Sequence, residues 1–262
     1  MALDRRDRSH VQSVERALRI IDVLAAENHD MSLTEVSNAL EWPKSTVHGL
    51  ITTLRDFSFV EQSPLTGKYS LGVKLFELGN IVARGWNIRE VALPFMRRLS
   101  ETTGETAHLA AEDNGDVLYI EKIDSARAFR IVSEIGARLP IHCTGLGKAI
   151  LAHKTPAEIR RIFLRNDLRA MTPNSITSLE KLEKELERIR KDGFAVDNGE
   201  VMEGLRCVAA PIRDKNGNVN YAVSVSGVLG NMYGARFDKI VETLKKTAED
   251  IMFGMGYRGF NK

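Results

Sequence analysis

The sequence lacks the features of membrane-spanning and exported proteins. Nowhere in its 262 residues does an apolar run approach the roughly 18 residues that a membrane-spanning helix needs. The charged segment from Asp4 to Arg8 is not followed by the apolar stretch of a secretory signal. We therefore expect a cytoplasmic protein that does not bind a membrane.

Cysteine is scarce, since Cys143 and Cys207 are the two in the chain. In a cytoplasmic protein they favour reduced thiols over a disulfide, and no Cys or His pair has zinc-finger spacing. We expect no metal and no cofactor, although a metal-binding sensor using His142, Asp197 and Cys207 remains an alternative. A small-molecule enzyme is a second alternative, because Cys143 beside His142, or Cys207 near His108, could form a nucleophile with a basic partner. No third, orienting group is identifiable, so we expect a protein that is not an enzyme.

An excess of positive charge is also missing. Residues 1–70 contain eight basic and ten acidic residues, a balance of −2. Affinity for nucleic acid depends on the number of phosphates that cations neutralise. DNA binding would therefore need a few well-placed cations and two copies of the site, and an interaction module without DNA binding remains a third alternative.

The clearest local signals lie between Ser32 and Leu71. Ser32 followed three residues later by Glu35 is a capping box, which predicts the start of a helix. Pro43 ends this helix and suits the start of the next one. A hairpin follows, with strands at 59–62 and 68–71 around a turn that ends at Gly67. Two short helices and a hairpin predict a winged helix-turn-helix.

The second of these helices has one apolar side and one side of short, uncharged groups. Val47, Leu50, Ile51 and Leu54 recur at helical spacing and should be buried. The opposite side can enter a major groove about 12 Å wide, although a solvated face is the plain alternative. Arg16, Arg55 and Lys68 are predicted phosphate contacts. The full set of predicted DNA contacts is Arg16, Lys44, Ser45, Thr46, His48, Thr52, Arg55 and Lys68.

Two further helices flank the motif. An apolar stripe of Val11, Val14, Leu18, Ile21 and Leu24 predicts a first helix over about 13–26 that completes a three-helix core. The segment 73–84 is too apolar for an isolated linker helix. We expect it, together with the first helix, to form a dimer interface.

From Ile88 onwards strands and helices are mixed. Helices are predicted at 89–102, 146–153, 156–165, 179–191 and 237–255, and strands at 106–112, 117–123, 129–135, 208–213 and 221–228. Asn114-Gly115 between apolar runs is a strong hairpin signal. Hairpins in place of regular βα alternation predict an α+β domain with an antiparallel sheet. The expected division is residues 1–72, a linker helix at 73–87 and residues 88–262.

Several segments are similar to one known family. They are Lys44–His48, Tyr69–Gly72, Ile141–Ala149, Gly204–Pro211 and Ala222–Gly227. Over nearly the whole chain the sequence resembles the IclR family of bacterial transcriptional regulators, and segments 71–79, 119–125 and 255–257 resemble its KdgR-like branch. The resemblance implies a winged helix, a linker helix and a GAF-like C-terminal domain, assembled as a dimer or a dimer of dimers. It implies a repressor that binds double-stranded operator DNA and responds to a small carboxylic acid, which in the KdgR-like branch is a keto-sugar acid.

One position departs from the family pattern. Family members commonly carry arginine where this chain has Gly49, on the side of the helix expected to meet DNA. Glycine in a helix interior costs about 1 kcal/mol relative to alanine. Either the helix backbone approaches the DNA closely, or the protein reads a different operator.

The resemblance also places an effector site in the C-terminal domain. Its residues are Ile131, Leu139, Gly145, Leu146, Asp197, Leu205, Cys207, Ser224 and Ser226. A glycine-flanked helix start suits a carboxylate, and Ser224 and Ser226 share one strand face. Their plain readings are solvent-facing serines and, for Cys207, a small core residue. Asp197 would accept hydrogen bonds from ligand hydroxyls, which favours a polyhydroxy or keto acid.

Overall fold

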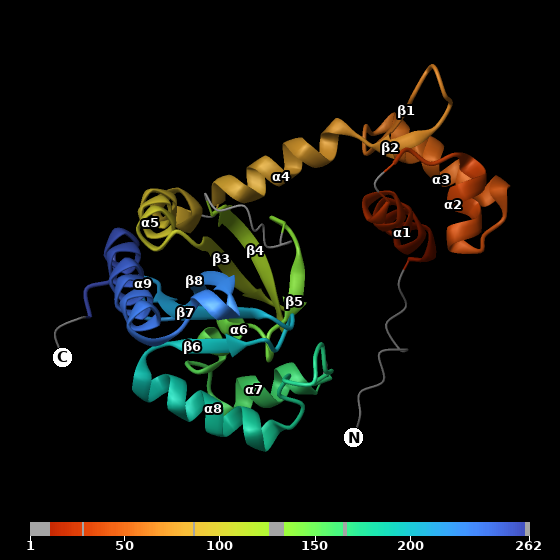
Figure 1. The fold of residues 1–262 in the computed structure, drawn as a ribbon. Helices are drawn as coiled ribbons and strands as arrows, with labels where there is room; N and C mark the ends of the chain where they lie inside the picture. The colour runs from red at the N-terminus through yellow and green to blue at the C-terminus, as the bar shows by residue number, and fades with distance from the viewer. Residues whose placement is uncertain (1–10, 28, 86, 126–133, 165–166, 260–262) are drawn as a thin grey trace. The chain divides into compact units, whose positions relative to one another are not determined.

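A computed structural model describes residues 11–27, 29–85, 87–125, 134–164 and 167–259. The chain divides into two compact units, Met1–Gly85 and Trp86–Lys262 (Figure 1), which are treated separately below. Within the described ranges, no helix is both long enough and apolar enough to cross a membrane.

The first unit is a winged helix-turn-helix. Its elements are α1 (Gln12–Ala26), α2 (Leu33–Leu40), α3 (Lys44–Asp56), β1 (Val60–Gln62), β2 (Tyr69–Leu71) and α4 (Val73–Gly85). The predicted capping box is confirmed, because Ser32 Oγ accepts from the Glu35 N–H while the Glu35 carboxylate accepts from the Ser32 N–H at 2.6 Å. Strands β1 and β2 pair antiparallel, and an isolated bridge ties Met31 to Tyr69. The helices and the wing thus share one small core.

The buried side of α1 differs from the predicted stripe. Ile20 and Leu24 are the buried residues of this helix, whereas Val11, Val14 and Leu18 are 67%, 56% and 56% exposed. The helix carries two overlapping apolar faces, and packing against α2 and α3 covers the one that contains Ile20. The other face remains open as one wall of an apolar groove of about 370 Å³, whose opposite wall comes from α3 and the residues after it.

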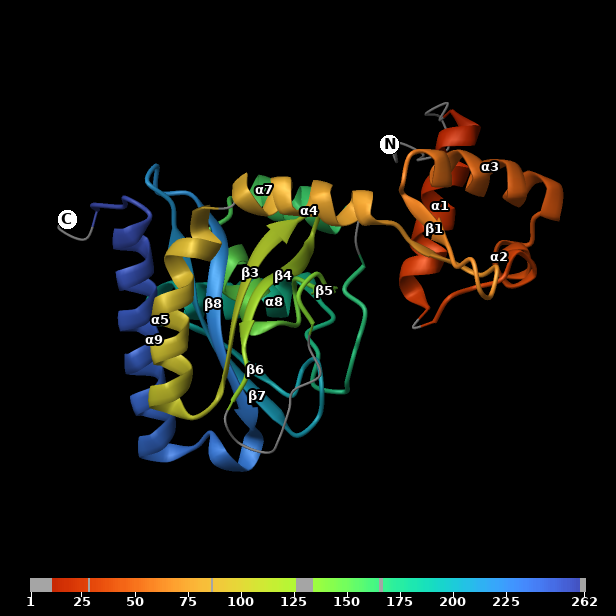
Figure 2. The same cartoon turned by 90° about the horizontal axis from the view of Figure 1, so that it is seen from above.

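The second unit is built on an antiparallel six-stranded sheet of order β5-β4-β3-β8-β7-β6 (Figure 2). The strands are β3 (Thr106–Asp113), β4 (Asp116–Ile123), β5 (Arg138–Pro140), β6 (Ala195–Asn198), β7 (Leu205–Arg213) and β8 (Val219–Val228). Asn114 and Gly115 have φ angles of 54° and 87°, the left-handed values that a tight hairpin requires. The predicted α+β class and both predicted hairpins are therefore confirmed.

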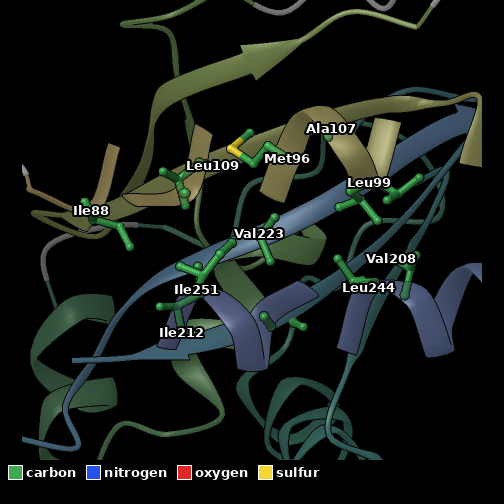
Figure 3. Packing of buried hydrophobic residues seen from close by; sticks show 14 of the residues in the cluster. Ile88, Met96, Leu99, Ala107, Leu109, Val208, Ile212, Val223, Leu244 and Ile251 are labelled. Atoms are coloured by element: carbon green, nitrogen blue, oxygen red, sulfur yellow. The ribbon is translucent and has the colours of Figure 1, made fainter. Parts of the chain in front are cut away.

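Helices cover both faces of this sheet. Helices α5 (Asn87–Thr103) and α9 (Gly234–Gly254) pack on one face. Figure 3 shows residues of this one core from both helices and from the central strands: Met96 and Leu99 of α5, Leu244 of α9, Leu109 of β3 and Val223 of β8. The other face is covered by α6 (Gly145–Leu151), with α7 (Pro156–Phe163) and α8 (Leu179–Asp192) around it. A short 3-10 turn, η2 (Leu229–Asn231), leads from β8 towards α9.

Two strands of this sheet were not predicted, and one predicted strand lies mostly outside the described residues. Strands β5 and β6 were not predicted, because three or four residues give little periodic signal and pairing with a neighbour stabilises them. The predicted strand at 129–135 lies mostly in 126–133, outside the described residues, and residues 134–135 are not in a strand.

Candidate DNA-binding face and effector site

Helix α3 presents the predicted short side chains away from its core. Val47 and Ile51 are buried, whereas Ser45 and His48 are exposed, and Thr46 is partly exposed. The predicted groove side of the helix is therefore accessible. Thr52 is partly exposed and its hydroxyl donates to the backbone oxygen of His48 at 2.8 Å.

Gly49 lies on this open face with no packing reason to be glycine. A Cβ added at Gly49 would meet no atom within 4 Å. Its helical φ also does not require glycine, since it is not among the residues with positive φ. The absence of a side chain therefore leaves space in front of α3 without improving the packing of the unit.

Arg16 and Lys44 lie near the turn between α2 and α3. The Arg16 guanidinium lies over the Trp42 ring, 5.4 Å from its centroid, so the first helix is held against the turn by a cation–π contact. Lys44 is exposed at the first position of α3. Both cations lie on the side of the unit where α3 begins.

Arg55 and Lys68 are tied to the wing. Arg55 Nη1 donates to Gln62 Oε1 at 2.9 Å, and Gln62 in turn donates to the Gly67 oxygen at 2.9 Å. Lys68 Nζ lies 3.8 Å from the Glu35 carboxylate. These contacts orient two predicted phosphate contacts beside the hairpin, although Glu35 offsets part of the charge of Lys68.

Strand pairing brings the predicted polar residues of the effector site together. Asp197 on β6 pairs with Cys207 on β7, which pairs with Ser226 on β8. Because side chains alternate along a strand, these three face α6 with Ser224, which lies two residues from Ser226. Asp197, Ser224 and Ser226 are at most 4% exposed. The site is therefore a buried polar row across three strands.

The start of α6 lies against this row. Thr144 caps the helix, accepting from the Gly147 N–H at 2.9 Å. Gly147 is required, because a Cβ there would lie 2.0 Å from the Ile141 oxygen. At Gly145 a Cβ would lie 3.6 Å from the Asp197 nitrogen, an ordinary contact. The helix start is therefore packed directly on the strand that carries Asp197.

The predicted apolar wall is brought together in part. Leu146 is 3% exposed and belongs to the core beneath α6, against which Leu139 of β5 also packs. Leu205 begins β7 and is buried opposite Val228 at the end of the sheet, outside that core. Ile131 lies outside the described residues.

A buried ion pair behind the polar row was not predicted from the sequence. Lys148 of α6 is 1% exposed; its Nζ donates to the Val196 oxygen at 2.6 Å, contacts the Glu200 carboxylate and lies 3.7 Å from Glu185. Glu200 also donates its N–H to Asp197 Oδ1 at 2.6 Å. The signal for it was a single lysine within the apolar run from Leu146 to Leu151.

Burial perturbs the two carboxylates beside Lys148. It raises the pKa of Asp197 to about 6, even though the Glu200 N–H and Lys148 oppose the shift. It raises the pKa of Glu200 to about 7, against the attraction of Lys148. Both carboxyl groups therefore titrate within two units of neutrality.

The two thiols do not have the properties of nucleophiles. Burial raises the pKa of Cys143 to about 12 and raises that of Cys207 well above its usual range. Burial also lowers the pKa of His108 to about 3. Near neutral pH the thiols stay protonated and His108 stays neutral, which does not favour an activated Cys–His pair.

The metal alternative also gains no geometric support. His142 Nε2 lies 3.0 Å from the backbone oxygen of Arg169. Across the ranges that the structure describes, no three His, Cys, Asp or Glu side chains are placed to share a metal ion.

Comparison with known proteins identifies the family. Residues 13–64 match the IclR helix-turn-helix domain, and residues 81–253 match the C-terminal domain of the bacterial transcriptional regulator IclR. The transcriptional regulator KdgR of Escherichia coli (strain K12) is 36% identical over 250 residues, which cover 95% of this chain and 95% of KdgR. The transcriptional repressor AllR of Salmonella typhi is 33% identical over 247 residues, covering 94% and 91%.

A solved structure agrees with these matches. The crystal structure of Thermotoga maritima IclR superposes with a TM-score of 0.79 at 33% identity, covering 95% of this chain and 100% of that one. Because the relatives are regulators of transcription, the enzyme hypothesis is set aside. The chain belongs to the IclR family of bacterial transcriptional regulators.

Proposed function

We propose that the protein is a cytoplasmic repressor that releases or binds its operator in response to a small carboxylic acid carrying hydroxyl or keto oxygens. The observation that carries the effector half is the buried polar row of Asp197, Cys207 and Ser226 beside the start of α6. Repression is supported by the similarity to AllR, which is named a repressor. The working division is residues 1–72 for DNA binding, 73–87 as linker helix and 88–262 for the effector.

The DNA half of the proposal predicts two kinds of contact. Thr46 on the open side of α3 contacts a base, so Thr46→Ala should reduce the preference for operator over random DNA by about 1–3 kcal/mol. Lys68 beside the wing contacts a phosphate, so Lys68→Ala should weaken both DNAs alike and lower the salt slope by about one unit. Fluorescence anisotropy at several salt concentrations measures both. An equal loss on both DNAs for Thr46→Ala, or an unchanged slope for Lys68→Ala, would remove that residue from the interface.

The effector half rests on complementary ends of the site. No described residue accepts a hydrogen bond from the N–H of Gly145 or Leu146, so these groups suit a ligand carboxylate. Asp197 would repel the same carboxylate and is proposed to accept from hydroxyls at the ligand's other end. Asp197→Ala should cost about 1.5–3 kcal/mol of affinity for a hydroxylated acid and little for an acid without hydroxyls.

A thermal-shift panel of small carboxylic and sugar acids tests this assignment. A ligand present at 100 times its dissociation constant should add about 2.7 kcal/mol to the free energy of unfolding. Calorimetry on the acids that shift the transition then compares the wild-type chain with Asp197→Ala. Tightest binding by an aromatic acid, or equal losses for all acids, would reject the sugar-acid class while leaving the regulator intact.

A homodimer formed through α1 and α4, with a dimer of dimers as the larger state, completes the proposal. Phe76 and Ile81 of α4 are 73% and 64% exposed, and Val14 of α1 is 56% exposed. Such apolar surface is typical of interfaces, and doubling the unit offsets its shortage of cations. Sedimentation should show no monomer at micromolar concentration. A stable monomer there would contradict the proposed interface.

A further inference from the structure

Strand β4 contains a bulge that redirects Tyr119. In the β3–β4 ladder Leu109 pairs with Glu121 but Ala110 pairs with Tyr119, so β4 carries one extra residue between them. Without that residue, Ala110 would pair with Ile120, and Tyr119 would face α5. With it, Tyr119 joins the core beneath α6 while Ile120 joins the core of α5 and α9. Bulges of this kind commonly re-aim a side chain at a functional site.

The redirected tyrosine extends the polar row of the effector site onto β3 and β4. Tyr119 makes an edge contact with His108, with ring centroids 5.3 Å apart and planes at 82°. His108 pairs with Ser224 across β3 and β8, and Ser226 Oγ lies 3.5 Å from His108 Nδ1. His108 therefore adjoins both serines of the site, and Tyr119 adjoins His108.

Two hydroxyl groups in this region have no hydrogen-bond partner among the described residues. Within the described part of the chain, no residue forms a hydrogen bond with the hydroxyl of Tyr119 or of Ser224. The residues are 9% and 2% exposed. Neither oxygen is among the fully buried side-chain atoms that lack a partner in the described residues, so each keeps some accessible surface, and both lie on the face that carries Asp197. A ligand oxygen on that face would satisfy both.

The groups of this region are uncharged near neutral pH. Burial lowers the pKa of His108 to about 3, helped by Lys122, and raises the pKa of Tyr119 above its usual range. Lys122 pairs with His108 across the strands, but its Nζ lies 2.8 Å from Asp124. The region therefore offers neutral donors and acceptors, and a second carboxylate buried here would lack a compensating cation.

The geometry points to Tyr119 and His108 as a neutral subsite of the effector site, which binds a hydroxyl or carbonyl oxygen of a monocarboxylic acid. This inference rests on the proposed effector function and adds two specificity-determining residues to it. The ligand class that fits is an acid with one carboxylate and uncharged oxygens along its chain.

Calorimetry on the full chain tests the subsite with acids matched in length. D-gluconate and hexanoate share a six-carbon chain and one carboxylate, and D-xylonate and pentanoate form a shorter pair. Tyr119→Phe removes only the hydroxyl and should weaken the hydroxylated acids about three- to tenfold, the range for one neutral hydrogen bond. The unsubstituted acids should change less than about twofold. His108→Phe keeps the edge contact, removes both ring nitrogens and should act in the same direction.

Tyr221→Phe is the matched control, because Tyr221 lies on β8 against the core of α5 and α9 and should affect neither class of acid. Thermal unfolding of each variant checks that the fold is retained, and Tyr119→Phe alone carries the test if His108→Phe does not fold. If the wild-type chain binds the hydroxylated acids but Tyr119→Phe weakens hydroxylated and unsubstituted acids equally, or weakens neither, the subsite is refuted and the proposed effector class stands. A wild-type chain that binds no hydroxylated acid would refute the proposed effector class and the subsite with it.

Discussion

Replacing Lys148 should destabilise the second unit strongly. Lys148 is 1% exposed, and Lys148→Met removes its hydrogen bond to the Val196 oxygen and leaves Glu200, whose side chain is 8% exposed, without its cation. Removing one partner of a buried ion pair costs about 3–5 kcal/mol. For a unit of this size each kcal/mol lowers the melting temperature by about 2–4 °C, so the unit should melt about 6–20 °C lower.

The loss should depend on pH because Glu200 can take up a proton. Burial raises the pKa of Glu200 from 4.5 to about 7 in the folded chain, so the folded state binds this proton more tightly than the unfolded state does. The stabilisation that comes from the bound proton is complete below pH 4.5 and is lost as the pH rises through about 7. Without Lys148 this carboxyl group should hold its proton still more tightly. The penalty of Lys148→Met should therefore be smaller at pH 5 than at pH 8.

Calorimetric unfolding at the two pH values measures both effects. Lys184→Met is the control, since Lys184 is 73% exposed in an ion pair with Glu180 within α8 and should change little. The double variant Lys148→Met/Glu200→Gln should recover at least half of the loss, because the carboxylate that contacts Lys148 is then replaced by a neutral amide. A loss below about 1 kcal/mol, or no recovery in the double variant, would refute the reasoning.

Two further substitutions test the open helix face and the buried carboxylate. Gly49→Ala should raise the free energy of unfolding of the first unit by about 0.5–1 kcal/mol, because the new Cβ meets no atom within 4 Å. A lower free energy of unfolding in a urea titration would contradict this. Weaker binding of the variant to the operator would indicate that the backbone at Gly49 approaches the DNA closely. Burial raises the pKa of Asp197 from 3.8 to about 6, so the stability of the wild-type chain falls as the pH rises through about 6. Asp197→Asn lacks this titration, so its free energy of unfolding should increase relative to that of the wild type by up to about 3 kcal/mol between pH 4 and pH 8. If denaturant titrations show that this difference in the free energy of unfolding does not grow with pH, burial does not destabilise the ionised carboxyl group of Asp197.

The helix-turn-helix could be predicted because its signals are local. The capping box of Ser32 and Glu35, Pro43 at the next helix start and the stripe from Val47 to Leu54 each act within one or two turns of chain. The face of α1 was predicted wrongly for the opposite reason. Val14 and Leu18 repeat at helical spacing as well as Ile20 and Leu24 do, and only the neighbouring helices decide which pair is buried.

The sheet shows the same division between local and distant information. The Asn114-Gly115 turn has its own backbone requirement, so the first hairpin was visible in the sequence. Strand β6 has four residues, and among the described strands it pairs with β7 alone. The register that places Asp197 opposite Cys207 is a product of that pairing and has no signature within either segment.

Tyr119 shows why the effector site could be read only in part. Alternation along residues 117–123 places Tyr119 on one face with Val117 and Glu121, but the bulge instead groups it with Val117 and Lys122. Nothing within β4 marks the extra residue, because a bulge exists only relative to the partner strand. The resemblance to a family supplied the serines, the thiol and Asp197, yet the side of the site formed by β3 and β4 depends on this register. The preference for neutral ligand oxygens at that side therefore depends on how the folded sheet places Tyr119, and the loss of affinity in Tyr119→Phe measures this preference directly.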